Sequence, residues 1–301
     1  MSEPLRPMGT GELLDRTFRL YKRHFLLFVG LGLPAPAIVL LLILLFMIVD
    51  TLPAAASAAA VIGISLCLIA VLFGFALTTA ATVRGVSALH LSKPTSIRRC
   101  YAELRGRYWR ITSVWLSVMI RMVGGSFLLY CLSILIGVTG AAAATFLGTA
   151  GVVIGVVIGI ASFVGGVLLA LTLLVRYSMA VQACVVEDIP PAIAIKRSVV
   201  LAKGSRNRIL TIYVLFSAIS SALMTSLFVL AGMTGGLFHS ERAGAAFMSL
   251  AFFLALLLTM PLATIAISLE YYDARVRKEG FDLQLLIATL EPLGGKAVTA
   301  P

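Results

Sequence analysis

The chain has 301 residues, of which 60% are hydrophobic and only 12% are charged. Soluble domains are about 45–50% apolar and about 25% charged, so this composition argues against a water-soluble globule. It also argues against a disordered protein, which would be poor in apolar residues. A net charge of +11 would indicate a nucleic-acid partner in a soluble protein. Here the basic residues lie beside apolar runs, so we expect no nucleic-acid partner but an attraction to anionic lipid headgroups.

Six apolar runs are long enough to cross the hydrocarbon core of a bilayer, which takes about 20 helical residues. They cover 25–49, 58–83, 111–138, 152–175, 209–238 and 247–269. The sequence therefore predicts an all-α integral membrane bundle of six transmembrane helices over residues 25–275. We expect an amphipathic segment over 1–24 before it and a tail over 276–301 after it, both cytoplasmic.

The Lys and Arg residues alternate between the two sides of this predicted bundle. Residues 1–24 carry five, the loop after the second span seven, the loop after the fourth six and the C-terminal tail four, whereas the other loops hold only Arg242. Basic loops stay on the cytoplasmic side of a membrane. We therefore expect a multi-pass protein of the bacterial cytoplasmic membrane with both termini in the cytoplasm.

The two large basic loops resemble each other at a constant offset of 98 residues. Ile97-Arg98-Arg99 matches Ile195-Lys196-Arg197, Arg105-Gly106 matches Lys203-Gly204, and Arg110-Ile111 matches Arg208-Ile209. Each loop follows a proline, and each reads as a short amphipathic helix, a glycine break and the next span. The pattern is typical of an internal duplication.

The first of these loops has one apolar helical face. Ile97, Tyr101, Leu104 and Tyr108 recur at helical spacing. The basic residues of this loop lie off that face and are Arg98, Arg99 and Arg105. The second loop carries the corresponding cations Lys196, Arg197 and Lys203. Such a helix is typical of the membrane interface, where its cations contact anionic headgroups or an acidic partner. The alternative is a connector packed against protein, because amphipathicity does not identify what the face touches.

Arg121 is the one charged side chain deep inside a predicted span. It lies about 15 Å along the helix from Ile111, and a charge at that depth is costly and a functional suspect. Its side chain leans back toward the cytoplasm, whereas that of Glu270, at the end of the sixth span, leans into the membrane. We therefore hypothesise an Arg121–Glu270 ion pair inside the bundle, with Glu12 or Asp15 as alternative partners.

Small residues follow one side of the fourth span at Gly151, Gly155 and Gly159. Glycines at every fourth position let helix backbones approach closely. The stripe predicts helix packing within the bundle, or alternatively the contact surface of a homo-oligomer.

No catalytic, cofactor or metal site is predicted. The four cysteines and three histidines are scattered, whereas a metal site needs them clustered, and the chain contains no Walker A loop, HExxH or GxSxG motif. Pro34 and Pro36 interrupt the first span and Pro261 the sixth, and broken spans line substrate sites in transporters. A transporter would thus have a polar cavity between those two spans.

Two stretches at the ends of the chain resemble a known family. GELLDRTFRLYKR from Gly11 to Arg23 and EYYDARVRKEGFDL from Glu270 to Leu283 resemble the bacterial glycerophosphoryl diester phosphodiesterase membrane domain, and the span pattern extends the resemblance over nearly the whole chain. In the name-giving enzymes a separate catalytic barrel carries a His-Arg-Gly motif, which none of the three histidines here begins. The resemblance therefore implies a membrane module without phosphodiesterase activity.

The leading hypothesis is a non-enzymatic membrane module that anchors or assists lipids, or an unidentified protein partner, at the cytoplasmic face. The alternative is a transporter or permease component for a small or lipid-like solute. A membrane-embedded lipid enzyme would need convergent acids, bases or nucleophiles near one depth, and the sequence offers no such cluster.

Overall fold

The computed structural model describes residues 8–49, 53–91, 93–237 and 240–280, and every regular element within them is a helix. These helices are α1 (Thr10–Arg23), α2 (Phe25–Gly32), α3 (Pro34–Val49), α4 (Ala54–His90), α5 (Ile97–Glu103), α6 (Tyr108–Leu147), α7 (Thr149–Tyr177), α8 (Ala180–Glu187), α9 (Pro191–Ala202), α10 (Arg206–Leu237) and α11 (Glu241–Glu279). The all-α prediction is confirmed.

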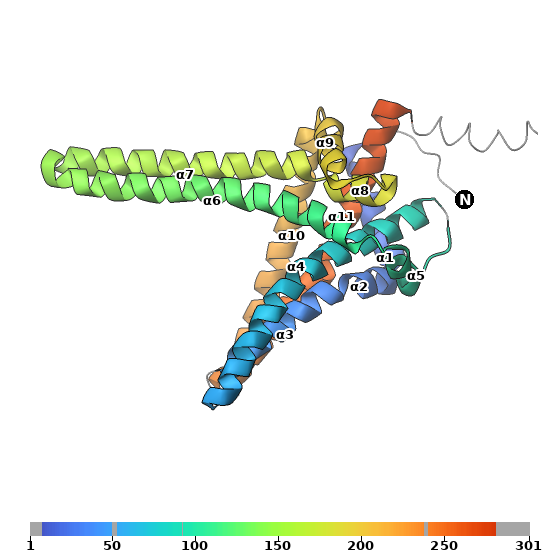
Figure 1. Ribbon diagram of the computed structural model, residues 1–301, viewed down its shortest axis with the longest axis horizontal. Helices are drawn as coiled ribbons and strands as arrows, with labels where there is room; N and C mark the ends of the chain where they lie inside the picture. Colours follow the sequence, from blue (N-terminus) through green and yellow to red (C-terminus); the bar gives the residue numbers. More distant parts are fainter. Residues whose placement is uncertain (1–7, 50–52, 92, 238–239, 281–301) are drawn as a thin grey trace, which may run out of the picture.

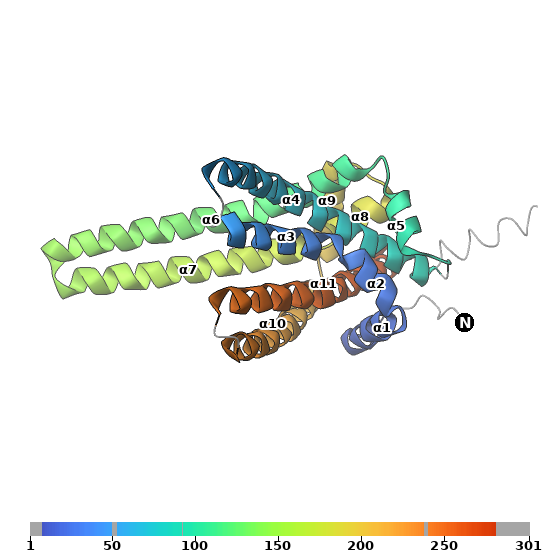
Figure 2. The same ribbon diagram turned by 90° about the horizontal axis from the view of Figure 1, so that it is seen from below.

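The long helices form three hairpins that extend from one base, and the α6–α7 hairpin points away from the other two (Figure 1). The α3–α4 and α10–α11 hairpins lie side by side, since α11 contacts both α3 and α4. The hairpins pair α3 with α4, α6 with α7, and α10 with α11, and a short helix (α1, α5 or α9) precedes each of them. The base, called the hub here, consists of α1, α2, α5, α8 and α9 with the adjoining ends of the long helices. Figure 2 shows the same arrangement from below, with the α6–α7 hairpin extending furthest from the hub.

Five of these helices are long and apolar enough to cross a membrane, and the count is six if α2 and α3 form one broken span. The chain is therefore a multi-pass membrane protein of the predicted class. Helix α6 has 40 residues, which corresponds to about 60 Å and exceeds a hydrocarbon core of about 30 Å. Part of this helix therefore extends beyond the hydrocarbon core.

The first span breaks where the prolines predict it. The axes of α2 and α3 differ by 47°, because Pro34 cannot donate to the carbonyl one turn earlier. Pro261, by contrast, lies inside the continuous α11. Close to this proline, the Leu258 carbonyl accepts a hydrogen bond of 3.0 Å from the Tyr21 hydroxyl, which ties α1 to α11.

The repeat predicted between the two basic loops is visible in the backbone. Gly106 and Gly204, which are related by the 98-residue offset, have φ angles of +84° and +95°. This left-handed region suits glycine, because any Cβ would be strained there. In each loop the glycine turns the chain out of the short helix and into the next span.

Helix α11 extends past residue 275, where the transmembrane domain is expected to end. Helix α11 continues without a break to Glu279 and ends at Gly280, whose φ is +57°. Its last turns pack in the hub through Tyr272, Ala274 and Val276, which are all buried. The remainder of the predicted tail, residues 281–301, lies outside the described residues.

Candidate functional site

The hub end of α11 is the most deeply buried segment of the molecule. Every residue from Ile265 to Ala274 is buried, and Tyr271 and Tyr272 are the largest fully buried side chains. Two carboxylates, those of Glu270 and Asp273, lie within this segment with side chains 0% exposed. A buried charge needs a partner, so the hub must supply cations to this helix.

Arginines from two helices and the backbone of the N-terminal segment surround these carboxylates. Asp273 accepts hydrogen bonds from Nη1 of Arg208 at 2.6 Å, from Nε of Arg277 at 2.7 Å and from the backbone N–H of Met8 at 2.6 Å. The Glu270 carboxylate lies 2.7 Å from Nε of Arg208. Arg277 also donates to the Met8 carbonyl at 2.6 Å. The cluster thereby joins α10, α11 and the segment before α1.

A second cluster joins α8, α9 and α11. The carboxylate of Glu187 lies 3.0 Å from Nε of Arg197 and 3.7 Å from Nε of Arg275, and it accepts a hydrogen bond of 2.5 Å from the Tyr271 hydroxyl. Arg197 also pairs with Glu279 at 2.6 Å. Because each of these side chains has at least two partners, the cluster holds α8, α9 and α11 together and leaves no charge free to bind a ligand.

Each hairpin is closed at its base by a contact between an arginine and a polar side chain. Arg16 lies 3.4 Å from Nδ1 of His90 at the base of the α3–α4 hairpin. Asp188 pairs with Arg107 at 3.0 Å and also with Arg110 at the base of the α6–α7 hairpin. The α10–α11 hairpin uses the Arg208–Asp273 pair described above. Arg110 and Arg208 occupy equivalent positions of the repeat and both bind carboxylates, but Arg110 pairs with the half-exposed Asp188 after α8, whereas Arg208 pairs with buried carboxylates of α11.

The hypothesis of an Arg121–Glu270 ion pair is wrong. The guanidinium of Arg121 leans back by one turn, as expected, but it donates to the Ser117 carbonyl at 2.8 Å and lies 6.0 Å from the ring centroid of Tyr177. Within the described part of the chain it pairs with no carboxylate, including Glu12 and Asp15. The reason is depth: Arg121 lies on the diverging α6–α7 hairpin, whereas Glu270 lies at the hub.

The predicted basic residues of the two loops fall into two groups. Four of them are exposed at the hub surface, namely Arg98, Arg105, Lys196 and Lys203. Arg99 is exposed but pairs with Glu103 at 3.1 Å within α5, whereas Arg197 belongs to the Glu187 cluster. On the apolar face, Leu104 is fully buried and the Tyr101 hydroxyl donates to the Leu31 carbonyl at 2.7 Å. Helix α5 is therefore a connector packed on protein, with cations on its outer side.

A basic pocket of 370 Å³ lies at the start of α10. It is lined by Gly204, Ser205, Arg206, Asn207, Arg208 and Arg277. Arg206 is exposed, and the free N–H groups at the start of a helix add partial positive charge. Arg208 and Arg277 face the pocket while their charges are balanced by Glu270 and Asp273. The arrangement suits a phosphate or another compact anion.

A second cavity, of 170 Å³, lies where the three hairpins converge on the hub. Among its lining residues are Thr79 of α4, Trp115 of α6, Tyr177 of α7, Gln182 of α8, Tyr213 of α10 and Thr264 of α11. The transporter hypothesis expected a polar cavity between the first and sixth spans. The observed one involves the sixth span, but neither α2 nor α3 lines it.

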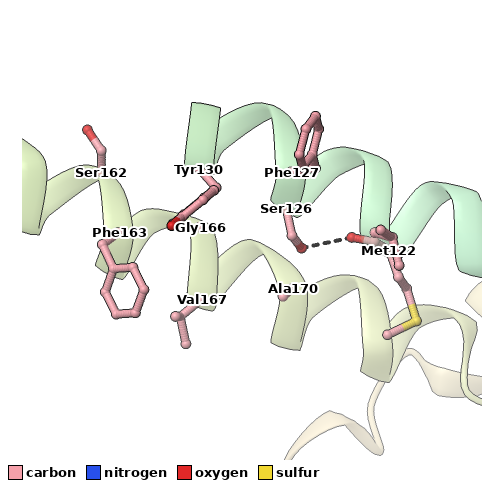
Figure 3. Close-up of a pocket in the computed structure, with 10 residues that line it drawn as sticks. Met122, Ser126, Phe127, Tyr130, Ser162, Phe163, Gly166, Val167 and Ala170 are labelled. Atoms are coloured by element: carbon pink, nitrogen blue, oxygen red, sulfur yellow. Dashed lines mark hydrogen bonds between the residues drawn. The ribbon is translucent and has the colours of Figure 1, made fainter. Parts of the chain in front are cut away.

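An apolar groove of 490 Å³ runs along the α6–α7 hairpin and shares Met122 with that cavity. Figure 3 shows its walls, with Met122, Phe127 and Tyr130 on α6 and with Phe163 and Val167 on α7. Of its two serines, Ser126 donates to the Met122 carbonyl at 2.7 Å. The groove therefore offers mainly apolar surface.

The glycine stripe of the fourth span packs within its own hairpin. A Cβ placed on Gly140 of α6 would lie 2.7 Å from Cα of Gly155, and Gly151 and Gly155 are both buried. A Cβ placed on Gly159 would meet no described neighbouring atom within 4 Å, so Gly159 makes no close helix contact within the described chain, and its role in an oligomer contact stays a prediction. Closer to the base of the hairpin, a Cβ placed on Gly125 would lie 3.3 Å from Leu173 Cδ1, and one placed on Gly166 would lie 3.6 Å from Leu129 Cβ, so the two helices also contact each other there.

The described residues hold no group of three or more His, Cys, Asp or Glu side chains that could bind a metal ion. Burial raises the pKa of the Cys100 thiol, which makes it a weak nucleophile. Sequence reasoning missed the roles of Arg208, Asp273, Glu187 and Gln182. For Arg208 the signal was present, because the repeat aligns it with Arg110.

Comparison of the chain with protein-family models, with curated proteins and with solved structures finds no match.

Proposed function

We propose that this chain is a non-enzymatic module of the bacterial cytoplasmic membrane whose hub faces the cytoplasm and binds the phosphate groups of anionic lipids. The basic pocket at the start of α10 carries the proposal. It combines three arginines with a helix N-terminus beside the membrane-crossing helices, and basic pockets at this depth bind lipid headgroups. The exposed cations Arg98 and Lys196 extend the same surface.

The distribution of charge supports this orientation. Apart from Arg121 and Arg242, the Lys and Arg residues of the described chain belong to the hub or its loops. Basic segments remain on the cytoplasmic side during insertion. Labelling with a membrane-impermeant maleimide tests the orientation. In intact cells Ser240→Cys, at the far end of α11, should react, whereas Ser205→Cys at the hub should react only after permeabilisation, and the reverse pattern would refute the proposal.

Lipid selectivity tests the binding itself. In the reconstituted protein, spin-labelled phosphatidylglycerol should be retained in preference to phosphatidylcholine. Replacing Arg98, Lys196, Lys203 and Arg206 by Gln should reduce this preference by about fivefold for each contacting cation, since each contributes about 1 kcal/mol near an anionic surface. Arg242→Gln at the opposite end is the matched control. An unchanged preference in the fourfold variant would contradict lipid binding at the hub.

We also propose that the chain belongs to the glycerophosphoryl diester phosphodiesterase membrane-domain family. Supporting this, the first motif lies on α1, which contacts α11, the helix that carries the start of the second motif, and Arg277 of the second motif binds the carbonyl of Met8, three residues before the first motif. Leu13 and Thr17 of the first motif are both buried. Substituting either motif should therefore weaken the same cluster.

A permease component is the second candidate, favoured by the cavity at the convergence of the hairpins, whose lining includes the polar residues Thr79, Gln182 and Thr264. A transport path would give the cavity access to water on both sides of the membrane. Thr264→Cys should then react with an aqueous maleimide from either side. The lipid-binding module predicts reaction from at most one side.

A further inference from the structure

The cavity between the hairpins contains a buried polar group without a partner. Gln182 is only 3% exposed, it lines the cavity, and its Oε1 atom makes no hydrogen bond. Buried amide oxygens are nearly always paired in folded proteins. The open acceptor therefore marks a place for a donor from a bound molecule.

The surrounding hydroxyl groups add both donors and acceptors. Ser178 and Thr264 donate to backbone carbonyls of their own segments, at 2.9 Å and 3.2 Å, so their oxygen lone pairs remain available. Tyr177 and Tyr213 line the same cavity, and in the part of the chain that the structure describes their hydroxyls form no hydrogen bond. Phenol groups donate readily. A ligand with several hydroxyl groups would find partners for each of them.

Charge selects against an ionic ligand in this cavity. None of its lining residues is Lys, Arg, Asp or Glu. An ion would have to leave water without a counter-charge, which is far costlier than burying a hydrogen-bonded neutral group. Arg121, which lies 6.0 Å from the ring centroid of the lining residue Tyr177, does not line the cavity and donates to the Ser117 carbonyl.

The apolar groove and this cavity share Met122 as a lining residue, and Figure 3 shows Met122 among the walls of the groove. We propose that the cavity and the groove together bind a neutral amphiphile, with its hydroxylated head beside Gln182 and one apolar chain along α6 and α7. The volume of 170 Å³ equals that of about five water molecules, which fits a small head. The groove volume of 490 Å³ falls within the usual ligand range of about 300–1,000 Å³.

This site shares no residue with the proposed headgroup pocket at α10, so either proposal can fail alone. Fluorescence of Trp115, which lines the cavity, provides a direct measurement. The chain has two tryptophans, and Trp109→Phe removes the other one, which is 78% exposed. In this background, titration of the detergent-solubilised full chain with monoolein should shift the Trp115 emission saturably.

Three probes separate the contributions of head and chain. Monoolein has a neutral hydroxylated head, oleate has the same chain with an anionic head, and glycerol is the head alone. Monoolein should bind at least about tenfold more tightly than oleate, since the site has no countercharge. Saturable binding of glycerol alone would assign the cavity to free polyols, whereas a requirement for the chain would assign it to lipids, and both outcomes support a neutral hydroxylated ligand.

Gln182→Leu should weaken monoolein binding by about tenfold, because it removes the unpaired acceptor while preserving the size of the side chain. Tyr213→Phe, which deletes one hydroxyl only, should weaken it several-fold and provides a second test if Gln182→Leu does not fold. Thr172→Val on the exposed side of α7 is the matched control. Equal binding of oleate and monoolein, or unchanged binding in both cavity variants, would overturn the proposal.

Discussion

The hub and the α6–α7 hairpin differ in how far their side chains are buried and in what those side chains contact. In the most apolar 18-residue stretch of α6 no residue is buried in the protein, whereas half of the corresponding stretch of α11 is. The hub in addition buries carboxylates, arginines and tyrosines in two clusters. The hairpin instead exposes large apolar side chains such as Phe127 and Leu128 on its outer surface.

The two regions are therefore stabilised by different surroundings. The hub is held by contacts within the protein, in which each buried charge has partners, so removing one partner leaves another unpaired. The hairpin is held to the hub only at its base, and its apolar surface needs lipid around it. We expect substitutions in the hub to act on the whole fold and substitutions in the hairpin to act locally.

The largest effect is expected from Asp273→Asn. It removes the negative charge that Arg208 and Arg277 share, in a position that is completely buried, and should lower the free energy of unfolding by about 3–5 kcal/mol. Thermal or denaturant unfolding in detergent measures the loss, and faster alkylation of the buried Cys100 reports opening of the hub. Glu103→Gln, in an exposed pair with Arg99, should cost at most about 1 kcal/mol. Equal losses of unfolding free energy in the two variants would contradict the view that the buried charges of the hub matter more than exposed ion pairs.

An intermediate effect is expected from Gly140→Val in the hairpin. The new side chain would collide with the backbone of Gly155, and overpacking of this kind costs about 1–3 kcal/mol. Separation of the two helices, measured by the distance between spin labels at Ser133 and Ser162, should increase while Cys100 stays protected. Gly159→Val, with open space around it, is the control, and an identical increase there would contradict close packing at Gly140.

A smaller effect is expected from Asp188→Asn at the base of the hairpin. Asp188 has a φ of +57°, which Asn also tolerates, so the variant changes charge without straining the backbone. Its side chain is 44% exposed, and the pairs with Arg107 and Arg110 should contribute no more than about 1 kcal/mol. A loss as large as that of Asp273→Asn, in the same unfolding measurement, would show that all the hairpin bases are equally critical.

The smallest effect is expected from Arg121→Met. Its guanidinium has no acidic partner in the described chain, so the unfolding free energy should change by no more than about 0.5 kcal/mol. The matched variant Arg208→Met, which leaves Glu270 and Asp273 without their shared cation, should be strongly destabilising. If both variants lowered the unfolding free energy by comparable amounts, Arg121 would have to stabilise the bundle through a contact inside it.

Several features of the fold follow from short stretches of sequence. The runs of apolar residues predict the spans, Pro34 predicts the break between α2 and α3, and the matched Gly106 and Gly204 predict two equivalent turns. Each of these depends on hydropathy or backbone conformation within a few residues. The internal repeat could have identified Arg208 as well, because its equivalent Arg110 also begins a span.

The ion pairs could not be predicted in the same way. The sequence gives the position of Glu270 and of Arg121 along their own helices, and on that basis alone the two are expected to lie at the same depth in the membrane. Which side chains form ion pairs depends instead on how separate helices converge. The hub brings the start of α10 beside the end of α11, whereas the hairpin takes Arg121 away from both.

The sequence by itself therefore determined an all-α membrane protein, its apolar spans and the turns between them, since hydropathy and backbone preferences act locally. Tertiary structure alone decided that Arg208 neutralises Glu270, that Gly155 but not Gly159 meets a neighbouring helix, and that Gln182 lies in a cavity. These contacts join residues far apart in the chain, and their energies depend on burial, which only the assembled helices create.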